Sequence, residues 1–124
     1  AQTEQARRAA DARVVTRALT AAPATVDLGG VQVQTWAFDG RLPGPEIRLA
    51  RDEVLRAELR NTLPQPTTVH WHGIALRNDM DGVADLTQPP VAANSSFTYE
   101  FAVPHAGTYF FHPHVGTQLD RGLY

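Results

Sequence analysis

The chain has 124 residues, of which 43% are hydrophobic and 19% charged, so it can bury the core of one small globular domain. Its formal net charge is -2, from 11 basic and 13 acidic residues, and this balance gives no indication of a nucleic-acid partner. No cysteine is present, which excludes disulfides, thiol nucleophiles, iron–sulfur clusters and cysteine-ligated zinc or blue-copper sites within this sequence.

The first residues differ in composition from the rest of the chain. Residues 1–12 are rich in alanine, glutamine and arginine and predict a short helix or a solvated tail, and the domain itself is predicted over residues 13–124. The start lacks the apolar core of a signal peptide, so the leader of an exported protein would have been removed from this sequence. Apolar runs reach only a few residues, against the roughly 20 that a membrane-spanning helix needs, so we expect no membrane span.

Short β-type segments punctuated by glycine and proline make up the body of the chain. A Gly29-Gly30 turn precedes the alternating residues 31–38, which predicts a hairpin. Residues 54–61 alternate charged with apolar side chains, as in an antiparallel sheet with one solvated face. Further extended segments are expected at residues 46–50, 67–76, 97–103 and 108–112. Roughly seven or eight short strands, without a convincing helix in the body, predict an all-β sandwich.

Four of the five histidines form two pairs spaced two residues apart, in His70-Trp71-His72-Gly73 and His112-Pro113-His114. Residues two apart on a strand point to the same face, so each pair can present two imidazoles to one cavity. Neutral imidazole binds copper, zinc, iron or nickel, and the lack of cysteine leaves only nitrogen and oxygen donors. The pattern therefore predicts one metal site built from both pairs.

We expect the residues that flank the two histidine pairs to have structural roles and not to bind the metal. Trp71 should point to the opposite face of its strand and stiffen the ligand pair by packing in the core. Gly73 should permit close backbone approach, and Pro113 removes one backbone N–H from the second ligand segment. His105 stands alone in a turn, and we interpret it as an exposed loop residue without a metal role.

Beyond these patterns, the sequence resembles a known family. The run Val69-His70-Trp71-His72-Gly73 resembles the first copper motif of the multicopper oxidases, the laccase-like group, and residues 106–114 resemble their second copper motif. Residues 38–45, 81–83 and 121–124 also fit the family pattern. The resemblance covers nearly everything from about residue 13 onward.

The resemblance implies a cupredoxin-like Greek-key β-sandwich, the first such domain of its enzyme. Family members oxidise substrates one electron at a time at a type 1 copper and reduce dioxygen to water at a trinuclear copper cluster. Carried over, His70 would bind the type 2 copper, and His72, His112 and His114 would bind the type 3 pair. Asp81 matches an acidic position that assists proton delivery, and its alternative interpretation is a turn residue before a glycine.

The other half of the cluster and the type 1 ligands belong to the last cupredoxin domain in this family, and their motifs are absent here. The family continues after the position of Tyr124, so we expect a sandwich that lacks its final strand. The expected partners are dioxygen and the remaining cupredoxin domains, in the same chain or in a neighbouring subunit. Two-domain members assemble as trimers. The family implies a secreted, periplasmic or cell-surface location.

The sequence is also compatible with a second function, from a different class of protein. A non-catalytic copper-binding or structural β-sandwich module would use the same four histidines for storage or assembly. A companion segment with a His-Cys-His motif would discriminate in favour of the oxidase. A cupin fits poorly, because Ala75, Leu76 and Arg77 stand where a glutamate should follow the histidine pair.

Overall fold

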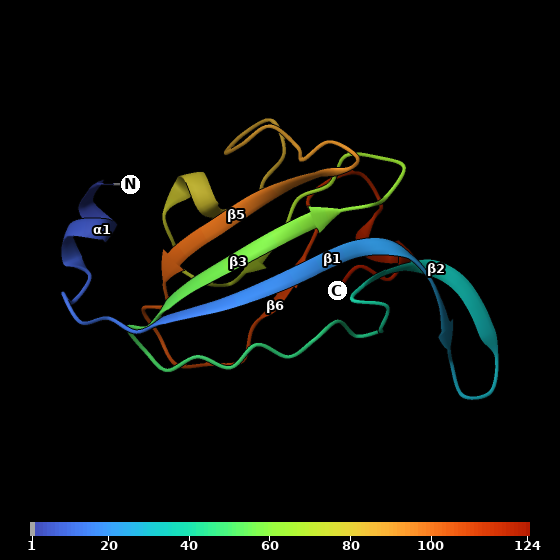
Figure 1. Cartoon of the computed structure of the whole chain (residues 1–124), viewed down its shortest axis with the longest axis horizontal. Helices are drawn as coiled ribbons and strands as arrows, with labels where there is room; N and C mark the ends of the chain where they lie inside the picture. Colours follow the sequence, from blue (N-terminus) through green and yellow to red (C-terminus); the bar gives the residue numbers. More distant parts are fainter. Residues whose placement is uncertain (1) are drawn as a thin grey trace.

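The computed structural model describes residues 2–124, which form two β-sheets with one short helix (Figure 1). The larger sheet holds, in spatial order, β2 (Gln32–Phe38), β1 (Val14–Asp27), β3 (Val54–Asn61) and β5 (Ser95–Ala102). The smaller sheet pairs β4 (His70–His72) with β6 (Phe110–His112). The remaining elements are α1 (Gln2–Arg7) and two 3-10 turns, η1 (Asn78–Met80) and η2 (Leu119–Arg121).

Strand β1 is long enough to take part in two pairings. Its residues 14–21 run parallel to β3, and its residues 21–27 pair antiparallel with β2. The turn between β1 and β2 is closed by Gly30, whose N–H donates to Asp27 Oδ1 at 2.6 Å, so the predicted hairpin is confirmed. The hairpin extends beyond the body of the molecule (Figure 1). Leu28 and Val31, at its turn, are exposed.

Strand β3 shows the alternation that the sequence predicts. Leu55, Ala57 and Leu59 are buried, whereas Arg56 and Arg60 are exposed. The strand pairs antiparallel with β5, as expected, but parallel with β1. The expectation of an antiparallel sheet is therefore wrong on one side of β3, because the pattern of burial reports the faces of a strand and not the direction of its neighbour.

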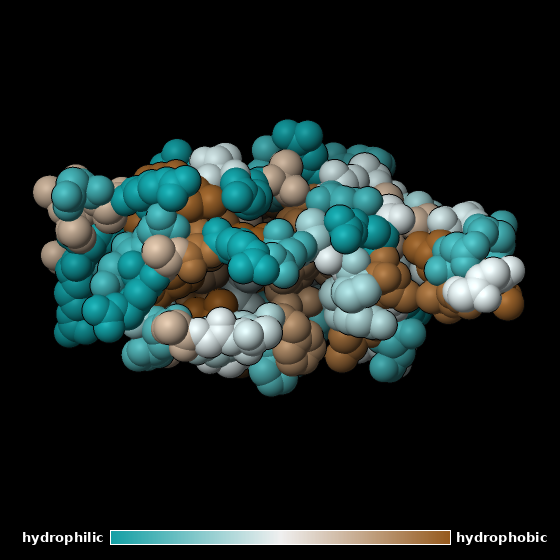
Figure 2. Space-filling model, turned by 90° about the horizontal axis from the view of Figure 1, so that it is seen from below, coloured by the Kyte–Doolittle hydropathy of each residue, from teal (hydrophilic) through white to brown (hydrophobic). Residues whose placement is uncertain are grey.

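The strand expected at residues 46–50 is not formed. Ile47 and Leu49 are half-buried between exposed residues, as in a strand, but no backbone N–H from residue 46 to residue 49 donates to another backbone group. Alternating burial alone does not produce a β-strand, because a strand needs a neighbouring strand with which it exchanges backbone hydrogen bonds. A groove of about 600 Å³ lies between this segment and residues 105–111. Viewed from below, the molecule shows apolar atoms in hollows between hydrophilic side chains (Figure 2).

An aromatic cluster joins the two sheets in the core. The ring of Trp71, on β4, lies 5.7 Å from Tyr99, 5.3 Å from Phe101 and 5.6 Å from Phe111, measured between centroids. Such aromatic pairs each contribute about 0.5–1.5 kcal/mol beyond the area they bury. Trp71 is 3% exposed, so the prediction that it packs in the core is confirmed, and His70 and His72 must face away from that core.

Helix α1 occupies part of residues 1–12, for which the sequence predicts a short helix or a solvated tail. Its Glu4 and the following Arg8 bond to β5, so a solvated tail does not describe these two residues, and Ala1 lies outside the described residues. Among residues 2–124, no helix has the length and apolar character needed to cross a membrane.

Candidate metal centre

The structure brings the four predicted histidines to one face of the small sheet. In the antiparallel register of β4 and β6, His70 lies opposite His112. His114 follows two residues later and forms a parallel bridge with Val83. The ring of His70 is central, with its centroid 5.6 Å from His72, 5.4 Å from His112 and 5.5 Å from His114.

Ring nitrogens from three of these residues converge. One nitrogen each from His70, His72 and His112 lie within 4.8 Å of one another, and His72 Nδ1 is 3.0 Å from His112 Nε2. Imidazole nitrogens bind metals such as zinc at about 2.0–2.1 Å, so two ligands at near a right angle lie about 3 Å apart. His114 stands outside this group of three, with its ring 6.5 Å from that of His112.

Carbonyl oxygens determine which ring nitrogens carry protons. His70 Nδ1 lies 2.7 Å from the carbonyl oxygen of Asp81, and His112 Nδ1 lies 2.8 Å from that of Pro113. Because a carbonyl oxygen only accepts, both Nδ1 atoms must donate, and in the neutral form of each imidazole the Nε2 atom therefore keeps the lone pair. In the bond between His72 and His112, His72 Nδ1 therefore donates to Nε2. A metal ion held by both residues would replace that proton.

Burial differs among the four histidines. His112 is 8% exposed, and this burial lowers the pKa of its imidazole, with the neighbouring histidines adding to the effect and the bond to Pro113 opposing it. A lowered pKa keeps His112 neutral near pH 7, which is the form that binds a metal. His72 and His114 are exposed, so the cluster is open on one side.

The ring of Phe110 packs beside the converging histidine nitrogens. Its ring stacks on His72 at 4.7 Å and on His112 at 5.0 Å. Phe110 lies two residues before His112, so the strand period already places it on the ligand face, whereas only the register of β4 with β6 sets it opposite His72. Thr68, not anticipated from the sequence, accepts a hydrogen bond from the backbone N–H of His114 at 3.0 Å.

Asp81 contacts His70 through two oxygens. Its carbonyl oxygen accepts from Nδ1, and its carboxylate Oδ1 lies 3.3 Å from the same nitrogen. Asp81 also ends the turn η1, so its interpretation as a turn residue holds together with its contact to the site. The next residue, Gly82, has φ +69° and packs so closely that a Cβ there would lie 1.8 Å from the carbonyl oxygen of Val69.

His105 and Gly73 lie outside the group of converging histidine nitrogens. His105 is exposed, as expected. Gly73, directly after β4, has φ +86°, and a Cβ there would be 3.3 Å from the ring of Tyr109. The expected close approach is therefore to a side chain, although a left-handed backbone already favours glycine.

A family model described as multicopper oxidase matches residues 20–124. The chain belongs to the multicopper oxidase family. It is 48% identical over 120 residues to the multicopper oxidase MmcO of Mycobacterium tuberculosis, an alignment that covers 97% of this chain and 24% of that protein. It is 35% identical over 106 residues to copper resistance protein A of Escherichia coli, covering 86% of this chain and 18% of that protein.

The fold agrees with this membership. The crystal structure of a multi-copper oxidase from Pseudomonas thermotolerans matches with a TM-score of 0.87 and 39% identity, covering 91% of this chain and 28% of the other. The predicted cupredoxin-like β-sandwich is thereby confirmed. This multicopper oxidase chain spans between 18% and 28% of the length of these relatives.

The converging histidines fit copper by their donor chemistry. All the nitrogens are imidazole nitrogens, a donor type that suits copper, and His112 is held neutral by burial. Each of His70 and His112 has its other nitrogen engaged by a carbonyl oxygen, the arrangement that orients metal-binding histidines.

Proposed function

We propose that this chain supplies half of a trinuclear copper centre to an oxidase that couples one-electron oxidation of a substrate to the four-electron reduction of dioxygen to water. The observation that carries the proposal is the convergence of His70, His72 and His112 on one face of a two-stranded sheet. Membership of the multicopper oxidase family supports it. Copper, when bound, would supply the one-electron redox chemistry.

The distances support a division of the ligands. His72 and His112, with nitrogens 3.0 Å apart, would hold one copper ion of the type 3 pair. His114, with its ring 6.5 Å from that of His112, would contribute to the second ion of that pair. His70, with its Nε2 lone pair left by the bond to Asp81, would bind the type 2 copper.

Asp81 would move protons beside the cluster. The formation of water from dioxygen consumes protons, and a carboxylate near cationic copper stays ionised and can relay them. The side chain of Asp81 is 31% exposed and its Oδ1 lies 3.3 Å from His70 Nδ1, so it contacts both solvent and the site. The carboxylate would thus receive a proton from water and pass it inward.

The open side of the cluster would receive the remaining ligands. The exposed His72 and His114 face the position from which another cupredoxin domain, in the same protein or in a neighbouring subunit of a homotrimer, would approach. That domain would also carry the type 1 copper. Family membership supports a location outside the cytoplasm, at the cell surface, in the periplasm or in the medium.

The decisive experiment removes single ligands from the intact protein that contains this chain. We expect His72→Ala and His112→Ala to lower the copper content and abolish oxygen uptake, and the exposed His105→Ala to leave both unchanged. Unchanged oxygen uptake in the two ligand variants would overturn the proposal. If the wild-type protein binds copper at these histidines but consumes no oxygen with any reducing substrate, the copper-binding module is the correct function.

A further inference from the structure

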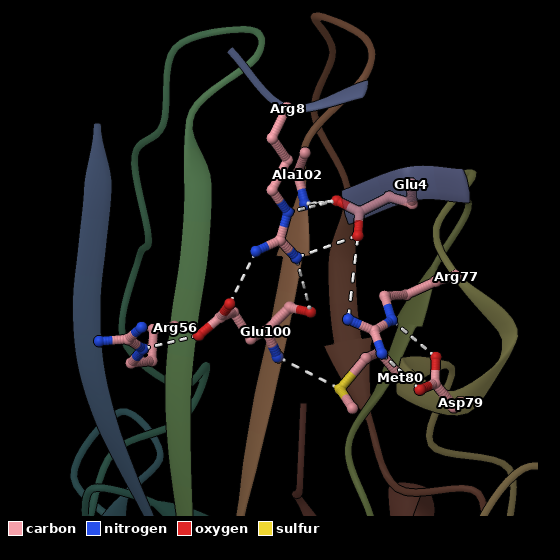
Figure 3. A network of polar contacts seen from close by, with 8 residues as sticks. All are labelled: Glu4, Arg8, Arg56, Arg77, Asp79, Met80, Glu100 and Ala102. Atoms are coloured by element: carbon pink, nitrogen blue, oxygen red, sulfur yellow. Dashed lines mark hydrogen bonds and ion pairs between the residues drawn. The ribbon is translucent and has the colours of Figure 1, made fainter. Parts of the chain in front are cut away.

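A network of paired charges connects helix α1 with the large sheet (Figure 3). Arg8 donates to Glu4 at 2.9 Å and to Glu100 at 2.7 Å, and Arg56 donates to the other carboxylate oxygen of Glu100 at 2.7 Å. Glu4 in turn accepts from the backbone N–H of Ala102 at 2.8 Å. The helix, β3 and β5 are therefore held together by alternating acidic and basic side chains.

Arg77 extends this network to the loop that reaches the histidines. Its guanidinium donates to both carboxylate oxygens of Asp79, at 2.7 and 2.6 Å, and lies 3.9 Å from Glu4. The side chain of Arg77 is 9% exposed. Such a two-pronged contact sets both the distance and the orientation of the two groups, which a single hydrogen bond does not.

The turn η1, which the Arg77–Asp79 pair holds at its start, is also attached to β5 at its end, through Met80. The backbone N–H of Glu100 donates to Met80 Sδ at 3.2 Å, and the N–H of Met80 donates to the carbonyl oxygen of Arg77 at 3.0 Å. Figure 3 shows Arg77, Asp79 and Met80 gathered beside β5. Residues 77–80 are therefore fixed to the large sheet through side chains and not through strand pairing.

Asp81 follows this anchored turn directly. On its other side Gly82 packs against the carbonyl oxygen of Val69, which leaves the loop no room to move toward the strand. The carbonyl oxygen of Asp81 is thus held between two anchored points, 2.7 Å from His70 Nδ1. The protonation of Nδ1, and with it the lone pair on Nε2, depends on the Asp81 oxygens staying in place, with this carbonyl nearer to Nδ1 than the carboxylate Oδ1 at 3.3 Å.

We propose that Arg77 is a positioning residue for His70. With Asp79 it holds the Asp81 carbonyl on Nδ1 and so presents Nε2 of His70 to a metal ion. The identity of that ion rests on the proposed function. The effect of Arg77 on the tautomer of His70 does not depend on the proposed function.

The test uses the intact protein, labelled with ¹⁵N-histidine and free of metal. Long-range ¹H–¹⁵N spectra distinguish a protonated from an unprotonated ring nitrogen, and His70→Ala assigns the signals. In Arg77→Ala we expect the Nε2–H form of His70 to rise at least about tenfold, and the affinity for Cu²⁺ at the histidine cluster to fall about 10–100-fold.

Arg60 provides a matched control. It donates to both carboxylate oxygens of Glu58, also two residues away and also at bonding distances of 3.1 Å, but on the exposed face of β3. Arg60→Ala should change neither the His70 signals nor the Cu²⁺ affinity. Arg77→Lys keeps the charge but loses the two-pronged contact, so its effect should lie between those of Arg77→Ala and wild type.

A second variant, close in shape to the wild-type protein, keeps the proposal testable if Arg77→Ala misfolds. Asp79→Asn removes the charge that Arg77 holds with little change of volume, and it should shift the His70 tautomer in the same direction. Folded Arg77→Ala and Asp79→Asn proteins with an unchanged His70 tautomer would overturn the proposal. Failure of the wild-type protein to bind Cu²⁺ would refute the proposed function, and the metal-free spectra would still decide the role of Arg77.

Discussion

His72 Nδ1 and His112 Nε2 meet at 3.0 Å although the two residues are not opposite one another in the sheet. The register pairs His70 with His112 and His72 with Phe110, so the contact is diagonal across the ladder. Diagonal neighbours on one face of an antiparallel pair are within reach of ring side chains. A diagonal contact between two ring nitrogens offers two donors to a single ion, with the opposing Phe110 stacked beside them.

The first prediction concerns this diagonal pair. Because His72 and His112 would hold the same copper ion, the double variant His72→Ala/His112→Ala should lose no more copper than either single variant. The copper content per molecule of intact protein, measured by atomic absorption, checks this. The pair His72→Ala/His114→Ala, in which the residues would hold different ions, should lose more than each single variant. Strictly additive losses for His72 and His112 would contradict a shared ion.

The second prediction separates the two oxygens of Asp81. Asp81→Asn keeps the backbone carbonyl that accepts from His70 Nδ1 but removes the carboxylate that we propose relays protons. We expect an unchanged copper content and a decrease of about 100-fold or more in oxygen turnover, the size typical of a lost general acid or base. The exposed Asp85 lies in the same loop, and Asp85→Asn should leave turnover unchanged. Equal turnover in wild type and Asp81→Asn would remove Asp81 from the mechanism.

The third prediction tests how tightly the loop packs beside His70. Gly82→Ala would place a Cβ 1.8 Å from the carbonyl oxygen of Val69, so backbone must shift, and we expect a loss of about 3 kcal/mol or more of stability. Gly116 also has positive φ, at +49°, but its Cβ would meet nothing within 4 Å. Gly116→Ala should therefore cost only about 1 kcal/mol. Chemical denaturation monitored by tryptophan fluorescence measures both, and similar losses would argue against close packing at Gly82.

The fourth prediction concerns acid stability. The guanidinium groups of Arg8 and Arg56 donate to Glu100 and lower the pKa of its carboxyl below the usual value of 4.5. A lowered pKa stabilises the folded state above the usual value, and this contribution is lost as the pH falls through the lowered one. Glu100→Gln should thus be less stable than wild type by about 1–2 kcal/mol at pH 7, and the difference should shrink as the pH falls below 4.5 and through the lowered pKa.

Urea denaturation at a series of pH values measures this difference. The exposed pair of Glu46 with Arg48 provides the comparison, and Glu46→Gln should change stability little at any pH. A difference between wild type and Glu100→Gln that does not vary with pH would show that the carboxylate charge has no part in holding α1 to the sheet.

Local features of the chain could be predicted from the sequence because they depend on residues close to one another. The Gly29-Gly30 turn and the alternation in residues 54–61 are both read from neighbouring positions. The spacing of His70 and His72, with Trp71 between them, specifies which side chain enters the core and which two leave it. Family resemblance then indicated copper, because both histidine motifs occur in order with their intervening segments.

Only the tertiary structure decided which segments far apart in sequence come into contact. Residues 46–50 alternate as a strand should, but no partner lies beside them, and β3 acquired a parallel neighbour that its own residues do not specify. His72 and His112 are 40 residues apart in sequence, and Arg8 lies 92 residues from Glu100. A side chain's chemistry and the face it occupies are local properties. Its partner is chosen by the packing of the whole core, which brings the converging histidine nitrogens and the Arg77 network to their places.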